Sequence, residues 1–161
     1  MHEKAYLRRT MTDEEYMQKA IAEAKAAAKE GEVPIGVIVV AQGRILARAH
    51  NLTETLHDVT AHAEMQAITA AANALGGKYL TGCTLYVTVE PCAMCAAAVS
   101  FARIENLYFG AYDKKNGAVV NGTKFYENEI CHHKPTVIGG VYEEKCAEML
   151  KKFFKSKRNK K

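Results

Sequence analysis

Two cysteines, Cys92 and Cys95, stand three residues apart behind Pro91 in the stretch TVEPCAMCAAA. A Cys-x-x-Cys pair can be a redox couple, half of a structural zinc site, or part of a catalytic zinc site. A partner for the pair stands about 30 residues earlier, in the stretch TAHAEMQA, which holds His62 and Glu64. Thiolates and imidazole suit zinc better than calcium or magnesium, so these residues predict a zinc site.

The spacing of the four residues suggests separate roles. Residues three apart on a helix share a face, and a helix start favours thiolates, so Cys92 and Cys95 can bind one ion with His62. Two residues span about 200° of a helix, so Glu64 can lie beside the metal at a helix mouth without binding it. Three protein ligands leave a fourth position for water, which is the pattern of catalytic zinc, and a nearby carboxylate can carry protons.

Two other interpretations stay open on these residues alone. A structural zinc site needs a fourth ligand, and the chain offers several candidates: His57, Cys83, Cys131, His132, His133 and Cys146. A redox role for the cysteine pair is weaker, because it gives His62 and Glu64 no function.

The elements that must position these residues follow from periodicity and turn residues. A capping box of Thr12 and Glu15 predicts a helix that ends at Gly31. Further segments read as strands (33–40, 45–50, 84–89, 106–111 and 136–141) or as helices (60–75, 91–102 and 142–157). This order predicts an α/β layer fold whose helices cover a mostly parallel sheet. The segment 111–135 is long for a connection, which predicts a functional loop or a short helix.

Composition is that of a single globular domain of 161 residues, with 48% hydrophobic and 25% charged residues. No stretch approaches a membrane span, and the basic N-terminal residues precede no apolar core typical of a secretory signal. Five cysteines, an odd number, favour a reducing cytoplasmic location with free or metal-bound thiols. Residues 151–161 hold seven Lys and Arg and no acid, so the net charge of +4 divides into +7 in this tail and 4 − 7 = −3 in the other 150 residues. Such a tail is either a solvated terminus or an arm that contacts phosphates.

The order His-x-Glu, then Pro-Cys-x-x-Cys, resembles the signature of the cytidine/deoxycytidylate deaminase superfamily. Within it the chain is most similar to bacterial tRNA-specific adenosine deaminases, over nearly its whole length after the first dozen residues. The similarity includes EVPIGVIVV (32–40), Asn51, FGAYDKKNGA (109–118) and FFKSKR (153–158). The resemblance implies a three-layer α/β/α fold with a mixed five-stranded sheet, in one zinc-dependent deaminase domain over residues 1–161 with a basic C-terminal helix and tail (about 142–161).

The resemblance also implies roles for individual residues. His62, Cys92 and Cys95 would bind one zinc ion per chain, and Glu64 would move protons between the attacking water, adenine N1 and the departing ammonia. The base would meet Asn51, Val33 and the N–H of Ala63. The RNA outside the base would meet Asp113, Phe153, Phe154 and Arg158. A tRNA anticodon stem-loop would be the substrate, its target base flipped out of a single-stranded loop, and the enzyme would be a homodimer.

The chain departs from this family at two places, both in the long segment 111–135. Val120 and Asn121 replace a usual Gly-Ser pair, and His132-His133 stands where Asn-His is common. Two other functions compete with tRNA deamination: a zinc deaminase of a free base or nucleoside such as cytosine or guanine, and a non-catalytic RNA-binding module with structural zinc. The basic Phe-Phe tail favours a polymeric substrate, and Glu64 argues against a structural site.

Overall fold

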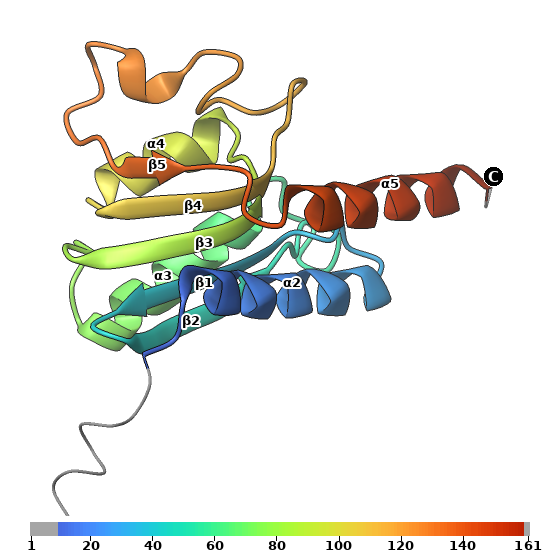
Figure 1. Cartoon of the computed structure of the whole chain (residues 1–161), viewed down its shortest axis with the longest axis horizontal. Helices are drawn as coiled ribbons and strands as arrows, with labels where there is room; N and C mark the ends of the chain where they lie inside the picture. Colours follow the sequence, from blue (N-terminus) through green and yellow to red (C-terminus); the bar gives the residue numbers. More distant parts are fainter. Residues whose placement is uncertain (1–9, 160–161) are drawn as a thin grey trace, which may run out of the picture.

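The computed structural model describes residues 10–159, which form three layers with a central sheet between two pairs of helices (Figure 1). Within these residues the sheet has five strands, in the order β2-β1-β3-β4-β5. They are β1 (Gly36–Ala41), β2 (Arg44–His50), β3 (Cys83–Val89), β4 (Asn106–Ala111) and β5 (Thr136–Ile138). The implied α/β/α fold is therefore confirmed.

The strand directions make the sheet mixed. β1 pairs antiparallel with β2 and also with β3, whereas β3, β4 and β5 are parallel to one another. Because β1 opposes both of its neighbours, β2 points the same way as β3, β4 and β5, and β1 alone runs in the opposite direction. The expectation of a mostly parallel sheet, drawn from element order, therefore agrees with the strand directions. The mixed sheet implied by the resemblance is confirmed.

One helix pair covers each face of the sheet. The buried side chains of α3 (Ala63–Leu75) and α4 (Ala93–Phe101) pack with Val37, Leu85 and Phe109. Those of α2 (Asp13–Lys29) and α5 (Glu143–Asn159) pack on the other face, with Ile38 and Tyr86. Because successive strand residues point to opposite faces, the apolar runs of β1 and β3 supply both cores.

Local signals explain where the helices begin and end. Thr12 caps α2, and the reciprocal bonds of Thr12 and Glu15 form the predicted capping box. Gly76, in the left-handed conformation at φ 72°, ends α3. The long segment before β5 contains a short helix, η1 (Phe125–Glu127), as predicted. No helix within residues 10–159 is long and apolar enough to cross a membrane.

Candidate active site

Three metal-binding side chains meet where α3 and α4 begin. His62 is the N-cap of α3, Cys92 is the N-cap of α4, and Cys95 lies in the first turn of α4. Their donor atoms all lie within 4.8 Å of one another. In the described part of the chain no other His, Cys, Asp or Glu joins this group, so none of the candidate fourth ligands reaches it.

The distances in this cluster fit a tetrahedral zinc ion. His62 Nδ1 lies 3.6 Å from Cys92 Sγ and 3.5 Å from Cys95 Sγ. Bonds of about 2.3 Å to sulfur and 2.0–2.1 Å to nitrogen, at the tetrahedral angle, hold these two atoms about 3.6 Å apart. His62, Cys92 and Cys95 are therefore positioned to bind zinc, and the set leaves a fourth position open.

The protonation of the two thiols agrees with a metal site. A hydrogen bond with Cys95, and a further one with His62, lower the pKa of Cys92 to about 4. The hydrogen bond with Cys92 and burial raise the pKa of Cys95. One thiolate is thus present at neutral pH, and zinc binding would release the proton of the second thiol.

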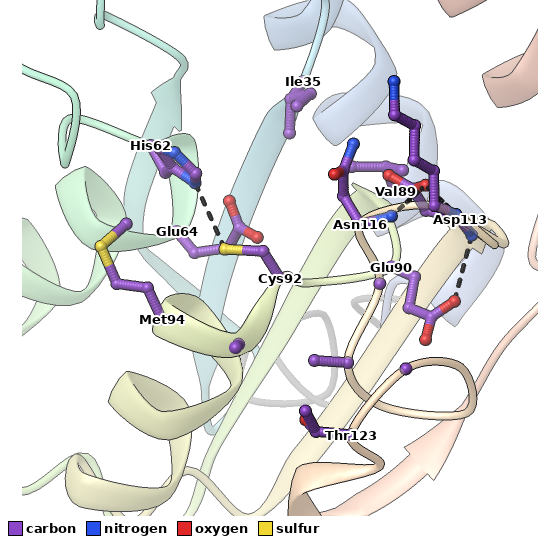
Figure 2. Close-up of a pocket in the computed structure, with 15 residues that line it drawn as sticks. Ile35, His62, Glu64, Val89, Glu90, Cys92, Met94, Asp113, Asn116 and Thr123 are labelled. Atoms are coloured by element: carbon purple, nitrogen blue, oxygen red, sulfur yellow. Dashed lines mark hydrogen bonds between the residues drawn. The ribbon is translucent and has the colours of Figure 1, made fainter.

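Glu64 lies beside the cluster without belonging to it. Its side chain is only 3% exposed and lines the same pocket as His62 and Cys92. Figure 2 shows His62, Glu64 and Cys92 together on one side of this pocket. Burial raises the pKa of Glu64 to about 7, so the carboxyl can give and take protons near neutral pH.

The pocket has a volume of about 590 Å³ and opens at one end of the sheet. The metal-binding side is formed by the starts of α3 and α4. The opposite side is the segment after β4, which includes Asp113, Asn116 and Gly117. A neighbouring cavity of about 290 Å³ shares His62, Asp113 and Asn116 with the pocket and adds Val33, Asn51 and Phe154. Val33 and Asn51, which the family resemblance implies as base contacts, therefore lie next to the metal cluster, as does Ala63, the first residue of α3.

Glu32 holds the segment that carries Asn51. Its fully buried carboxylate accepts hydrogen bonds from the Thr55 amide and hydroxyl, both at 2.6 Å, and from the Glu54 amide at 3.1 Å. The amide of Asn51 also donates to it, at 3.4 Å. Sequence reasoning missed this anchor, although an acid inside the apolar run GEVPIGV must find partners if buried.

Glu90 holds the opposite wall of the pocket. Its carboxylate, in a residue only 2% exposed, accepts the amides of Asp113, Val119, Val120 and Asn121 at 2.9–3.1 Å, and the Asn121 side chain at 2.7 Å. Burial would raise the pKa of Glu90, but these bonds lower it, so the group is a carboxylate. Glu90 directly precedes Pro91 and Cys92 in the turn between β3 and α4. This turn therefore supports both the metal site and the facing wall of the pocket.

Gly117 is required by this packing. A Cβ there would lie 2.5 Å from the Asp113 carbonyl oxygen and 2.6 Å from Glu90 Oε1. The side chain of Asp113 accepts the amides of Lys115 and Asn116, at 3.1 and 2.9 Å, and so caps its own turn. The residue expected to meet the RNA backbone therefore also stabilises the wall.

The two places where the chain departs from the family differ in their contacts. Val120 and Asn121 donate to Glu90, as described above, and the Asn121 side chain adds one bond to this network. His133 Nε2 lies 2.7 Å from the Ile104 carbonyl oxygen, and the His133 carbonyl accepts the Ser100 hydroxyl at 2.7 Å. His133, which matches the family pattern, thus ties the segment before β5 to the end of α4, whereas His132, the residue that departs from it, is exposed.

The aromatic pair of α5 divides between two cavities. Phe154, which is 44% exposed, lines the cavity beside Asn51 and also a basic groove of about 630 Å³ between α5 and the segment after β4. Lys115, Lys151, Lys157 and Arg158 line this groove. Phe153 lines a separate cavity, between α5 and α2. The sequence could not separate the two aromatic residues.

Comparison with known proteins agrees with this site. The family model of the MafB19-like deaminases matches residues 11–158, so fold and site together define a deaminase. The chain is 52% identical to the tRNA-specific adenosine deaminase of Agrobacterium fabrum, over 89% of this chain and 94% of the relative. It is 50% identical to the protein of that name from Bacillus subtilis, over 92% of each. The chain belongs to the family of tRNA-specific adenosine deaminases.

A solved structure from work on A-to-I editing by tRNA:A34 deaminases supports the same assignment. It is 52% identical, covers 84% of this chain and 98% of that chain, and superposes with a TM-score of 0.83. The assignment to the zinc-dependent hydrolytic deaminases, inferred from the sequence, is confirmed. The interpretation of Cys92 and Cys95 as a redox couple is therefore rejected.

Proposed function

We propose that this protein converts the wobble adenosine of a tRNA anticodon to inosine, using one zinc ion held by His62, Cys92 and Cys95. The observation that carries the proposal is the place of Glu64, which is buried beside a three-donor metal cluster and excluded from it. A structural zinc site has no use for such an acid. Bound zinc would supply a Lewis acid that lowers the pKa of a water molecule.

The residues of the pocket have distinct parts in this reaction. Glu64 takes a proton from the attacking water and delivers it to adenine N1. It then takes the second proton from the new hydroxyl on C6 and passes it to the amino group, so that the C6–N bond breaks, ammonia leaves and the C6 carbonyl of inosine forms. Val33 packs on the base, while the side chain of Asn51 and the N–H of Ala63 bind its edge. The Ala63 N–H is available because the first amides of a helix have no partner within it.

The RNA outside the base would follow the basic groove. Phe154, Arg158 and Asp113 lie along one continuous path from the catalytic pocket, since the cavities share Asp113 and Asn116. Phe153, on the α2 side of α5, would contact RNA beyond this path. Proteins that bind single-stranded nucleic acid commonly do so with lysines and aromatic rings. The groove therefore suits an anticodon loop.

The proposal is tested by incubating the zinc-loaded protein separately with an anticodon stem-loop, free cytosine and free guanine. Inosine at the wobble position of the stem-loop is expected, because a free base needs no basic groove. Deamination of only the free bases would replace the proposal with the free-base alternative. Zinc binding with no deamination of any substrate would favour the RNA-binding module.

Three further expectations belong to this proposal. The chain forms one deaminase domain, supported by two helix layers that pack on one sheet. It works as a homodimer, and Phe101 and Ile130, which are 73% and 71% exposed, offer apolar surface for a contact between copies. Its place is the cytoplasm, where tRNA is found. Light scattering at the assay concentration gives the oligomeric state. A protein that is monomeric there and fully active would contradict the dimer.

A further inference from the structure

A second basic cavity lies on the far side of α5 from the catalytic groove. This α2–α5 cleft, of about 430 Å³, is lined by residues of both helices and of the turn before β1: Lys25, Ala28, Lys29, Pro34, Met149, Lys152, Phe153 and Ser156. Its lining has three lysines and no acid among the described residues. In Figure 1, α2 and α5 run side by side on one face of the sheet.

The positive charge of the cleft favours the binding of an anion. Three ammonium groups around one cavity repel one another, and no carboxylate lines the cavity to offset that repulsion. Lys29 lies in the last turn of α2, where the helix dipole favours a cation. Lys25 and Lys152 do not lie in the last turn of α2, so the dipole of this helix does not explain why three lysines line the cleft.

The floor of the cleft suits an aromatic base as well as a phosphate. Phe153 is half-buried there, edge-on to Phe154 with ring centroids 5.5 Å apart, and Lys157 Nζ lies 5.4 Å from the Phe153 ring centroid. Met149 and Pro34 complete the apolar part. An aromatic ring in a cavity lined by lysines is an arrangement that binds stacked bases and their phosphates.

The cleft adjoins the cavity beside Asn51, because neighbouring residues of the chain line the two. Val33 and Phe154 line the cavity beside Asn51, and their chain neighbours Pro34 and Phe153 line the α2–α5 cleft. A strand that leaves the pocket over Val33 and Phe154 therefore reaches the cleft directly.

We propose that the α2–α5 cleft binds a second single-stranded stretch of the RNA substrate, with its phosphates on Lys25, Lys29 and Lys152 and a base on Phe153. This inference rests on the proposed function. The anticodon loop would then lie across α5, with one strand in the catalytic groove and the other in the cleft.

The test is the full-length, zinc-loaded double variant K25E/K29E, assayed on an anticodon stem-loop over a series of salt concentrations. We expect KM to rise at least about tenfold with kcat within about twofold, because the reacting base does not touch the cleft. Loss of two phosphate contacts to a single strand should lower the slope of log KM against log salt by about 1.4. The variant Phe153→Leu, which keeps apolar volume, should raise KM at least about fivefold through lost stacking.

The matched control is K78E/K134E, which changes net charge equally. Lys78 precedes β3 and Lys134 precedes β5, at the end of the parallel strands opposite the pocket. Its KM and salt slope should stay close to those of the unchanged protein. Equal increases in the two double variants, or no change in K25E/K29E, would overturn the inference, and the cleft would then be a solvated surface or a site for another anion. Failure of the unchanged protein to form inosine would instead overturn the proposed function.

Discussion

At the scale of single residues, three buried glutamates around the pocket have different environments and different tasks. Glu64 lies beside the metal cluster, where burial raises its pKa to about 7. Glu32 and Glu90 are surrounded by N–H and O–H donors, and the pKa of each is lowered despite burial. Hydrogen-bond donors stabilise the charged form of a carboxylate and lower its pKa, whereas burial disfavours the charged form and raises the pKa. The environment thus separates two anchors from one proton carrier.

Replacement of Glu90 by glutamine should weaken RNA binding more than zinc binding. The amide would face the N–H groups of Asp113, Val119, Val120 and Asn121 with one oxygen instead of two, and a buried donor left without a partner costs about 1–3 kcal/mol. We expect zinc content near one ion per chain, a raised KM for the stem-loop, and a free energy of unfolding lowered by about 2 kcal/mol.

The control for Glu90→Gln is Asn121→Ser, which removes only the side-chain bond of 2.7 Å and keeps the four backbone bonds. Its effect on KM should be the smaller of the two. If Glu90→Gln loses zinc while KM per zinc-loaded enzyme is unchanged, Glu90 supports the metal site alone and not the facing wall.

At the scale of elements, His50 at the end of β2 fastens the sheet to α2. Its ring nitrogens each lie 2.9 Å from a carboxylate, Nδ1 from Glu23 and Nε2 from Glu30. Burial would lower the pKa of His50, but the hydrogen bonds and charges of Glu23 and Glu30 raise it above 6.5. Glu32, whose carboxylate is also near His50, adds to the negative surroundings.

The raised pKa of His50 predicts a pH-dependent stability. The stabilisation by protonated His50 is fully present below the unfolded pKa of about 6.5, and it is lost as pH rises through the folded value. The difference in unfolding free energy between the unchanged protein and His50→Gln, measured with urea, should therefore be larger at pH 6 than at pH 9. A difference that is equal at the two values would contradict the paired imidazolium.

Most helices and strands can be predicted from the sequence, but a few features that depend on long-range contacts cannot. The capping box of Thr12 and the strand at residues 106–111 were predicted with their bounds, because both depend on local patterns. The strand predicted at 136–141 is shorter, ending at Ile138. The antiparallel pairing of β1 with β3, and the wall built on Glu90, depend on contacts between distant residues that periodicity does not report.

The candidate site shows the same division. His62, Cys92, Cys95 and Glu64 were found from spacing, since two helix starts carry them. Glu32 has no role predicted from the sequence, and Glu90, before Pro91, is interpreted there only as a residue at the helix start that supports the metal site. Their role in holding loops could not be predicted, because most of their partners are backbone amides, which any residue can provide. The only signal in the sequence was an acid within an apolar run.

At the scale of the whole molecule, α5 lines two cavities that lie beside the catalytic pocket and its adjoining cavity. One side of the helix lines the basic groove and the other lines the α2–α5 cleft. Basic charge is thereby concentrated beside the pocket, where it can attract RNA and hold it in register.

The triple variant K151Q/K157Q/R158Q should weaken RNA use without harming chemistry. These three residues are exposed and line the groove, so their loss should leave the fold intact. We expect a raised KM for the stem-loop, an unchanged kcat, and a slope of log KM against log salt lowered by about 2. An unchanged slope would indicate that the basic C-terminal residues are solvated and do not contact phosphates.

The central claim is that Glu64 carries protons for deamination of the wobble adenosine and does not hold the metal. The most direct measurement is zinc content and inosine formation on an anticodon stem-loop, in the unchanged protein and in Glu64→Ala. The account predicts one zinc ion per chain in both proteins, and inosine formation reduced at least about 100-fold in the variant, since proton transfer of this kind contributes about 10²–10⁴-fold. Loss of zinc from Glu64→Ala, or inosine formation at the unchanged rate, would contradict it.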